Sequence, residues 1–363
     1  MAANIRGRRP TCRRRALPSA RSSSNSISST EQVGFVMSNP EIEASISKAL
    51  GDIASRKAVS NIYFVACGGS FAQMHASKFV VDKEAKTISA EAYSSAEFIV
   101  RNPARLGPDS IVVLCSKSGD TPETVEAAKF AKAKGAYVIG MTAFPESPLA
   151  KTADTAIIFV TMLVDASPDM TMAIILRVTF GILREREGNE KHKALQSSLA
   201  NVAGVVSRLQ EAHARDAAEW ASRSKRESLI YTVASGANYG VAYNFAICLL
   251  QEMQWVHSQA IHSGEYFHGP FEVTDHDVPF FILLGLGDTR PVDERALAFA
   301  RKYSEKVVAL DAASFDLEGL EASVLEYVLP IVFLQVMRIY AMKLSDERGH
   351  PLTVRRYMWK MAY

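Results

Sequence analysis

Between residues 40 and 160, short apolar segments alternate with amphipathic segments of helical period. Apolar residues recur every three to four positions over 40–58, which predicts a helix with one buried face. Strands and helices then alternate along the chain. The predicted strands are 61–67, 87–91, 110–115, 136–141 and 155–160, and the predicted helices between them are 70–83, 93–100, 121–134 and 147–152. This alternation is typical of an α/β fold, in which helices flank a parallel sheet and ligands bind at the carboxyl ends of the strands.

The same organisation begins again after residue 193. A long apolar helix is predicted over 171–184, and the charged segment 185–193 is predicted to be a linker. A helix over 195–222 then opens the second half in the way that 40–58 opens the first. The chain is therefore predicted to contain two domains, 37–193 and 194–363, each of ordinary domain size.

Two sequence matches support an internal duplication. The segment Ile62-Tyr-Phe-Val-Ala-Cys-Gly68 matches Ile230-Tyr-Thr-Val-Ala-Ser-Gly236, and Gly119-Asp-Thr121 matches Gly287-Asp-Thr289. Both matches have an offset of 168 residues. Agreement at one offset indicates a structural repeat, so both domains are predicted to share one fold.

Composition and charge narrow the class of protein. The chain has 363 residues, of which 48% are hydrophobic and 22% charged, as in a globular domain. No uninterrupted apolar run approaches the ~20 residues that span a bilayer, so no membrane partner is expected. Residues 1–36 contain seven Arg and one Glu. Because the net charge of the whole chain is +2, the remainder carries a charge of about −4. A mildly acidic remainder does not favour a nucleic-acid partner.

The basic segment 1–36 is predicted to be a disordered extension. It is rich in Arg and Ser and lacks an apolar core, so it is no secretory signal. Its composition fits an organellar transit peptide, and it also fits upstream sequence translated from a wrongly assigned start, with Met37 as the true beginning. We favour the second interpretation. The four cysteines lack metal-ligand spacing and are interpreted as reduced thiols, which favours the cytoplasm; they are Cys12, Cys67, Cys115 and Cys248.

Two strand-to-helix junctions carry the residues of a phosphate site. After the first predicted strand come Gly68, Gly69 and Ser70, and after the third comes Ser116-Lys-Ser-Gly-Asp-Thr121. Glycines permit a tight turn, while backbone N–H groups, a helix dipole and hydroxyl donors favour an anion. The candidate phosphate ligands are Gly68, Gly69, Ser70, Ser116, Lys117, Ser118 and Thr121. The alternative for the second loop is an ordinary helix N-cap with surplus serines.

The second copy of the repeat lacks these hydroxyl groups. Asn238 stands at the position of Ser70, while Leu284 and Leu286 replace Ser116 and Ser118. One phosphosugar site per chain is therefore expected, in the first domain.

Candidate chemistry lies in the second domain. Glu252 ends an apolar helix that begins near Tyr239, and His268 lies in a loop fixed by Gly269 and Pro270. A carboxylate and an imidazole that converge on a sugar can move a proton between carbons and open the ring. The alternatives are a solvated carboxylate at a helix end and a histidine satisfied by loop backbone. Glu265 either orients His268 or faces water. Together with His257 and His262, these histidines form no metal pattern.

The two loops together, Cys67-Gly-Gly-Ser70 and Ser116-Lys-Ser-Gly-Asp-Thr121, resemble the sugar isomerase (SIS) domain, where such loops hold the phosphate of a phosphosugar. The segment from Glu252 to His268, with Gly264-Glu-Tyr-Phe-His-Gly-Pro270, is similar to the isomerase half of glucosamine-6-phosphate synthase. In that family a Glu and a His handle enolisation and ring opening. The ending Arg356-Tyr-Met-Trp-Lys360 resembles the synthase tail, whose Lys enters the active site.

Two departures separate the chain from the synthase. It shows no glutaminase domain with its nucleophilic cysteine, and the segment 164–171 lacks the lysine that the synthase carries nearby. The chain is more similar to stand-alone deglycases of fructoselysine 6-phosphate and related Amadori compounds, which share the Gly-Glu-x-x-His-Gly-Pro loop and an Asp-Glu-Arg like Asp346-Glu-Arg348.

The resemblance implies a fructosamine 6-phosphate deglycase of two tandem SIS domains. Its catalytic residues would be Glu252, His268 and Lys360, and it would need neither metal nor organic cofactor. Relatives build the active site from two subunits, so the resemblance implies a homodimer or larger homo-oligomer. Two alternatives stay open: an aldose–ketose isomerase or deaminase acting on fructose 6-phosphate or glucosamine 6-phosphate, and a phosphosugar-binding regulatory protein without catalysis. Against the latter, the chain shows no helix-turn-helix segment, and Glu252 with His268 would be unexplained.

Overall fold

The fold is known from a computed structural model that describes residues 38–160, 166–358 and 360–361. The basic segment 1–36 lies outside these ranges, and so do residues 164 and 165 of the segment 164–171, in which the synthase lysine is missing.

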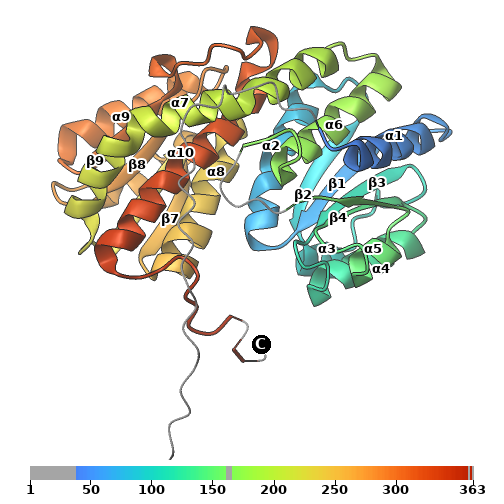
Figure 1. The fold of residues 1–363 in the computed structure, drawn as a ribbon, viewed down its shortest axis with the longest axis horizontal. Coiled ribbons are helices and arrows are strands. Elements are labelled where there is room, and N and C mark those ends of the chain that lie inside the picture. The colour runs from blue at the N-terminus through green and yellow to red at the C-terminus, as the bar shows by residue number, and fades with distance from the viewer. Residues whose placement is uncertain (1–37, 161–165, 359, 362–363) are drawn as a thin grey trace, which may run out of the picture. The chain divides into compact units, whose positions relative to one another are not determined.

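The first half contains a sheet of five parallel strands in the order β2-β1-β3-β4-β5 (Figure 1). The strands are β1 (Asn61–Ala66), β2 (Ser89–Ser94), β3 (Ser110–Cys115), β4 (Tyr137–Thr142) and β5 (Thr155–Ile158). Ala66, at the end of β1, pairs with Ser94 of β2 and with Cys115 of β3. Three neighbouring strands therefore end at the same edge, where the loops of the predicted phosphate site begin.

Helices cover both faces of this sheet, as the sequence predicts. Ile62 and Phe64 of β1 face one apolar core, while Tyr63 and Val65 face another, because successive side chains of a strand point to opposite faces. The first core includes side chains of α1 (Pro40–Ala54), α2 (Gly68–Glu84) and α6 (Thr171–Glu187). The second includes side chains of α3 (Ser95–Arg101), α4 (Pro122–Ala133) and α5 (Pro148–Thr152).

The second half repeats the arrangement with four parallel strands, in the order β7-β6-β8-β9. They are β6 (Leu229–Ala234), β7 (His257–His262), β8 (Phe280–Leu284) and β9 (Val307–Asp311). The order equals that of the first sheet without its fifth strand, and β6 and β7 begin 168 residues after β1 and β2. The predicted α/β class with a parallel sheet in each half is confirmed. The domain boundary between residues 193 and 194 stays a prediction.

The helices of the second half are α7 (His192–Ser224), α8 (Tyr239–Asn244), α9 (Arg290–Tyr303) and α10 (Leu325–Arg348), with a π-helix, η2 (Phe245–Met253), directly after α8. Short 3₁₀ turns are η1 (Gly236–Asn238), η3 (Ser263–Glu265), η4 (Pro270–Val273), η5 (Ala312–Ser314) and η6 (Ala322–Val324). The predicted linker 185–193 is shorter than expected, because α6 continues to Glu187 and α7 already begins at His192. Gly188, with φ of +70°, ends α6 in the left-handed conformation.

One apolar core joins the two halves. It contains Phe64 of β1, Phe281 of β8 and Val332 of α10, together with side chains of α2, α6, α7 and the π-helix. Helix α10 is long and apolar enough to cross a membrane by length and composition alone, but 61% of its apolar window is buried. Packing in this core therefore accounts for its apolar character.

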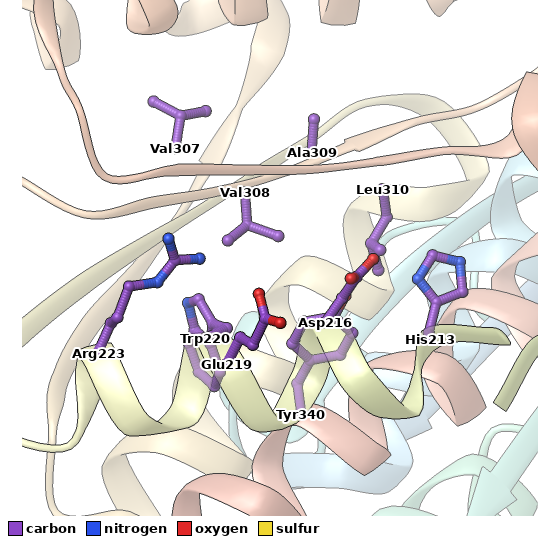
Figure 2. Close-up of a pocket in the computed structure, with 10 residues that line it drawn as sticks. All are labelled: His213, Asp216, Glu219, Trp220, Arg223, Val307, Val308, Ala309, Leu310 and Tyr340. Carbon is purple, nitrogen blue, oxygen red and sulfur yellow. The ribbon is translucent and has the colours of Figure 1, made fainter. Parts of the chain in front are cut away.

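A hollow of about 210 Å³ lies between α7 and β9, the last strand in the order of the second sheet. Figure 2 shows five side chains of α7 that project toward β9: His213, Asp216, Glu219, Trp220 and Arg223. None of the predicted site residues lines this hollow. The predicted phosphate loops lie elsewhere, at the carboxyl edge of the first sheet.

Candidate active site

The two predicted phosphate loops lie next to each other. Because Ala66 pairs with Cys115, the residues that follow them, Cys67 and Ser116, leave the sheet side by side. The Thr124 hydroxyl of α4 donates to the Cys67 sulfur at 3.8 Å, which joins the second loop's helix to the first loop. Burial raises the pKa of the Cys115 thiol to about 12, and a hydrogen bond with Ser70 acts in the opposite direction. The structure thus brings Ser70 and the 116–121 loop together.

The second loop is held by Ser116, whose side chain is buried. Its hydroxyl accepts the Gly119 N–H at 3.1 Å and lies 2.8 Å from the Thr121 hydroxyl and 3.5 Å from that of Ser118. Gly119 has φ of +70°, and a Cβ there would lie 2.2 Å from the Ser147 hydroxyl, so the turn requires glycine. Three hydroxyl groups are thereby gathered before the first turn of α4.

The N-cap alternative for this loop receives little support. Thr121 occupies the N-cap position of α4, but its side chain makes no capping hydrogen bond and lies instead against Ser116. Lys117 and Ser118 are exposed. Hydroxyl and ammonium groups therefore surround the positive end of a twelve-residue helix, which favours a bound anion.

Gly68 and Gly69 shape the first loop in different ways. Gly68 has φ of +53°, which allows the sharp entry into α2. Gly69 allows close contact with the π-helix region, because a Cβ there would lie 3.4 Å from the Asn244 Nδ2 and 3.6 Å from the Cys248 sulfur. The first loop of one half thus packs directly against a helix of the other.

Glu252 lies one turn beyond Cys248 in that π-helix. Burial raises the pKa of the Cys248 thiol to about 12, and the charge of Glu252 contributes in the same direction, so the two side chains are close. The structure therefore places Glu252 on the helix that contacts Gly69. The sequence predicts the helix that begins near Tyr239, but not its π geometry, a rare form that is frequent at functional sites.

Glu252 has a partner that the sequence does not reveal. The Arg355 Nε donates to the Glu252 Oε1 at 2.7 Å, with side chains that are 8% and 24% exposed respectively. The two residues are 103 positions apart, and no periodicity or motif relates them. Arg355 is thus a candidate site residue that the sequence pattern does not predict.

His268 is not brought to Glu252 within the chain. Its side chain is exposed, and its backbone N–H donates to the Glu265 carbonyl at 2.9 Å. Within the described ranges, its imidazole makes no hydrogen bond or ion pair with any residue, including the exposed Glu265 side chain. The loop therefore presents His268 to the outside.

Lys360 lies in the C-terminal tail, which begins after α10. Its ammonium group donates to the Arg355 carbonyl, next to the residue that pairs with Glu252. Its side chain is otherwise exposed. Among the described residues, no group of three or more His, Cys, Asp or Glu side chains is arranged to hold a metal ion.

Comparisons with known proteins show what the chain is similar to. Residues 56–176 match the model of the SIS domain family. The chain is 48% identical to fructosamine deglycase FrlB of Bacillus subtilis, over 90% of this chain and 98% of that protein. It is 29% identical to fructoselysine 6-phosphate deglycase of Escherichia coli O157:H7, over 83% of this chain and 86% of that protein. A solved structure of a candidate phosphosugar isomerase from Bacillus subtilis matches with a TM-score of 0.86 and 48% identity, over 88% of this chain and 97% of that one.

Proposed function

The chain belongs to the SIS-domain family and, within it, to the fructosamine deglycases, and from this membership we propose that it hydrolyses 6-phosphorylated fructosamines. The products are glucose 6-phosphate and a free amine or amino acid. The observation that carries the proposal is 48% identity with a deglycase over 98% of that protein's length. The arrangement of the site supports it, because hydroxyl-rich phosphate loops contact the helix of a carboxylate.

In this proposal the first half binds the 6-phosphate. Hydroxyl groups of Ser70, Ser116, Ser118 and Thr121 donate to its oxygens, with Lys117 nearby as a cation. Backbone N–H groups of the 116–121 loop complete the set, and Gly68 and Gly69 allow the first loop to approach closely. Charge-assisted hydrogen bonds to a phosphate are stronger than neutral ones, so these groups fix the sugar's position.

Glu252 then acts as the general base. It removes a proton from C1 of the open-chain ketosamine, and the electron pair moves onto the C2 carbonyl oxygen, which takes up a proton to give an enolamine. The proton returns at C2 while the nitrogen gives up its own proton, which leaves an imine between C1 and the nitrogen. Water adds to this imine and expels the amine, which leaves the aldehyde of glucose 6-phosphate. The substrate's own carbonyl and nitrogen stabilise the charge, so the reaction needs no added cofactor.

His268 acts as the general acid in ring opening or at the sugar oxygen. Because its imidazole is exposed, we place it in the active site of a neighbouring copy, and we therefore propose a homodimer or larger homo-oligomer with shared sites. Lys360 is the third proposed catalytic residue, and its contact with the Arg355 carbonyl supports a location near Glu252. Free thiols at Cys67, Cys115 and Cys248 support the cytoplasm as the compartment.

A substrate panel tests the proposal. The full chain is incubated with the 6-phosphates of fructosyl-lysine, fructosyl-asparagine and fructosyl-glutamine, and with glucosamine 6-phosphate, while a coupled dehydrogenase measures glucose 6-phosphate. Release from a fructosyl-amino acid is the expected result and ranks the amine partners. Fructose 6-phosphate formed from glucosamine 6-phosphate, with no release from the fructosyl compounds, would contradict deglycation and favour an isomerase or deaminase. Binding without any turnover would favour a regulatory protein.

A further inference from the structure

The C-terminal tail is fixed to the end of the π-helix that carries Glu252. The Gln254 Nε2 donates to the His350 carbonyl at 2.7 Å, and the Arg348 Nη2 donates to the Gln254 carbonyl at 3.3 Å. The His350 ring lies 4.3 Å from the Trp255 ring. These contacts join residues 348–350 to residues 254–255, directly after the helix.

Trp255 adopts an unusual backbone conformation at this junction. It has φ of +54°, a left-handed conformation that is rare for a bulky residue, and its side chain is 40% exposed. The Arg356 guanidinium lies 4.3 Å from the centre of its ring. The left-handed turn thus exposes the indole ring, and Arg356 of the C-terminal tail makes a cation–π contact with it.

The neighbouring residue, Arg355, is turned the other way, into the protein. Its Nη1 donates to the Leu352 carbonyl at 2.7 Å and to the Val354 carbonyl at 2.9 Å, so the tail's own backbone orients the guanidinium. Its Nε meets the Glu252 Oε1 at 2.7 Å. The carboxylate of the proposed base is therefore held in one orientation by a buried cation that is itself held in place.

We propose that Arg355 is the positioning residue of Glu252, delivered by the C-terminal tail. This inference rests on the proposed function and deepens it. A carboxylate removes a carbon-bound proton only from a narrow range of positions, and a misplacement of about 1 Å costs on the order of 10²-fold in rate. A bond to one oxygen restrains the carboxylate and leaves the second oxygen for the substrate.

The test compares Arg355→Met and Arg355→Lys with the full wild-type chain in the deglycase assay. We expect kcat to fall about 10²-fold in Arg355→Met while KM changes less than about threefold, because phosphate binding lies in the other half. Arg355→Lys restores the cation and recovers at least about tenfold of the lost kcat.

A matched control uses an ion pair outside the site. The Arg208 Nε lies 2.6 Å from the Asp316 Oδ2, with side chains that are 44% and 53% exposed, so Arg208→Met also removes a guanidinium–carboxylate pair. Its kcat and KM stay at the wild-type values.

The inference is wrong if Arg355→Met keeps kcat within about threefold, if its loss lies in KM alone, or if Arg355→Lys is no better than Arg355→Met. Arg355→Lys keeps the test valid should Arg355→Met fail to fold. Failure of the proposed function looks different, because the wild-type chain would then release no glucose 6-phosphate. A wild-type chain that is active, with Glu252→Gln inactive and Arg355→Met active, contradicts the positioning role alone.

Discussion

The two halves share one backbone plan and differ at the loop after the third strand of each. In the first half this loop gathers the hydroxyl groups of Ser116, Ser118 and Thr121. In the second, the Asn238 amide lies close to Gly285, because a Cβ on Gly285 would lie 2.6 Å from the Asn238 Nδ2. The second half also carries Leu284 and Leu286 where the first half has Ser116 and Ser118. Both copies keep the parallel-sheet fold, and the hydroxyl groups proposed to bind the phosphate lie in the first.

The two halves also differ in the step of the proposed reaction to which each contributes. The second half supplies Glu252 from the helix that packs on the first half's Gly69. Binding and proton transfer would then reside in different copies of the same fold. Variants in the two halves should therefore fail in different kinetic parameters.

The largest expected effect follows Glu252→Gln. The amide keeps the size of the side chain but cannot accept a proton, so kcat should fall by at least ~10²-fold. Binding of glucose 6-phosphate, measured by calorimetry, should be retained, because the phosphate loops are unchanged. Near-normal turnover would end the assignment of Glu252 as base.

A smaller effect is expected for Ser118→Leu, which gives the loop after β3 the residue that the second half has at the corresponding position. Loss of a hydrogen bond to a charged group, worth about 1.5–3 kcal/mol, should raise KM roughly 10- to 100-fold with little change in kcat. The matched control is Leu286→Ser, at the corresponding position in the second half, where the side chain is 36% exposed. Steady-state kinetics of both variants check the prediction. Equal effects of the two would show that the halves do not differ in binding.

The smallest effect is expected for Arg290, which holds the loop after β8 in the second half. The Arg290 Nη1 donates to the Gly285 carbonyl at 2.9 Å and to Asp311 at 2.7 Å, and Nη2 donates to the other Asp311 oxygen at 2.9 Å. These bonds hold the pKa of Asp311 below its ordinary value of 3.8. Because both side chains are partly exposed, Arg290→Met should lower the free energy of unfolding by only about 1 kcal/mol at pH 6.

The sign of its pH dependence follows from that lowered pKa. The contribution of Asp311 is fully present above the ordinary carboxyl pKa and is lost as the pH falls through the lowered value in the folded protein. Urea unfolding of wild type and Arg290→Met should therefore differ at pH 6 and converge as the pH falls below the ordinary carboxyl pKa of 3.8 and through the lowered value. A difference that stays constant with pH would exclude this ion pair as its source, and KM should be unaffected.

Much of the fold is predictable because its strands are buried on both faces. Every residue of β1 and β3 is buried, so both read as short apolar runs between helical patterns. The repeat offset of 168 residues then predicts where strands of the second half lie from the strands of the first. The ends of elements are less predictable, and β2 spans 89–94 instead of 87–91, since its exposed and half-buried residues lack a clear apolar pattern.

The candidate site is likewise only partly predictable from the sequence. Its loops could be predicted because glycines and hydroxyl residues after a strand have a local physical meaning. The π geometry around Glu252 could not, because Phe245–Met253 is largely apolar and gives no distinguishable period over nine residues. The pair of Glu252 and Arg355 could not either, since it depends on where a distant tail folds back. The exposure of His268 likewise depends on loop geometry that sequence pattern does not encode.

The left-handed Trp255 also has an optical consequence. Of the tryptophans in the described ranges, Trp220 is 5% exposed within the core, whereas Trp255 is 40% exposed beneath Arg356 and beside His350. Indole fluorescence depends on the polarity and charge around the ring. Detachment of the tail would change the surroundings of Trp255 and leave those of Trp220 unaltered. The chain therefore carries its own spectroscopic reporter of the segment that brings Arg355 to Glu252.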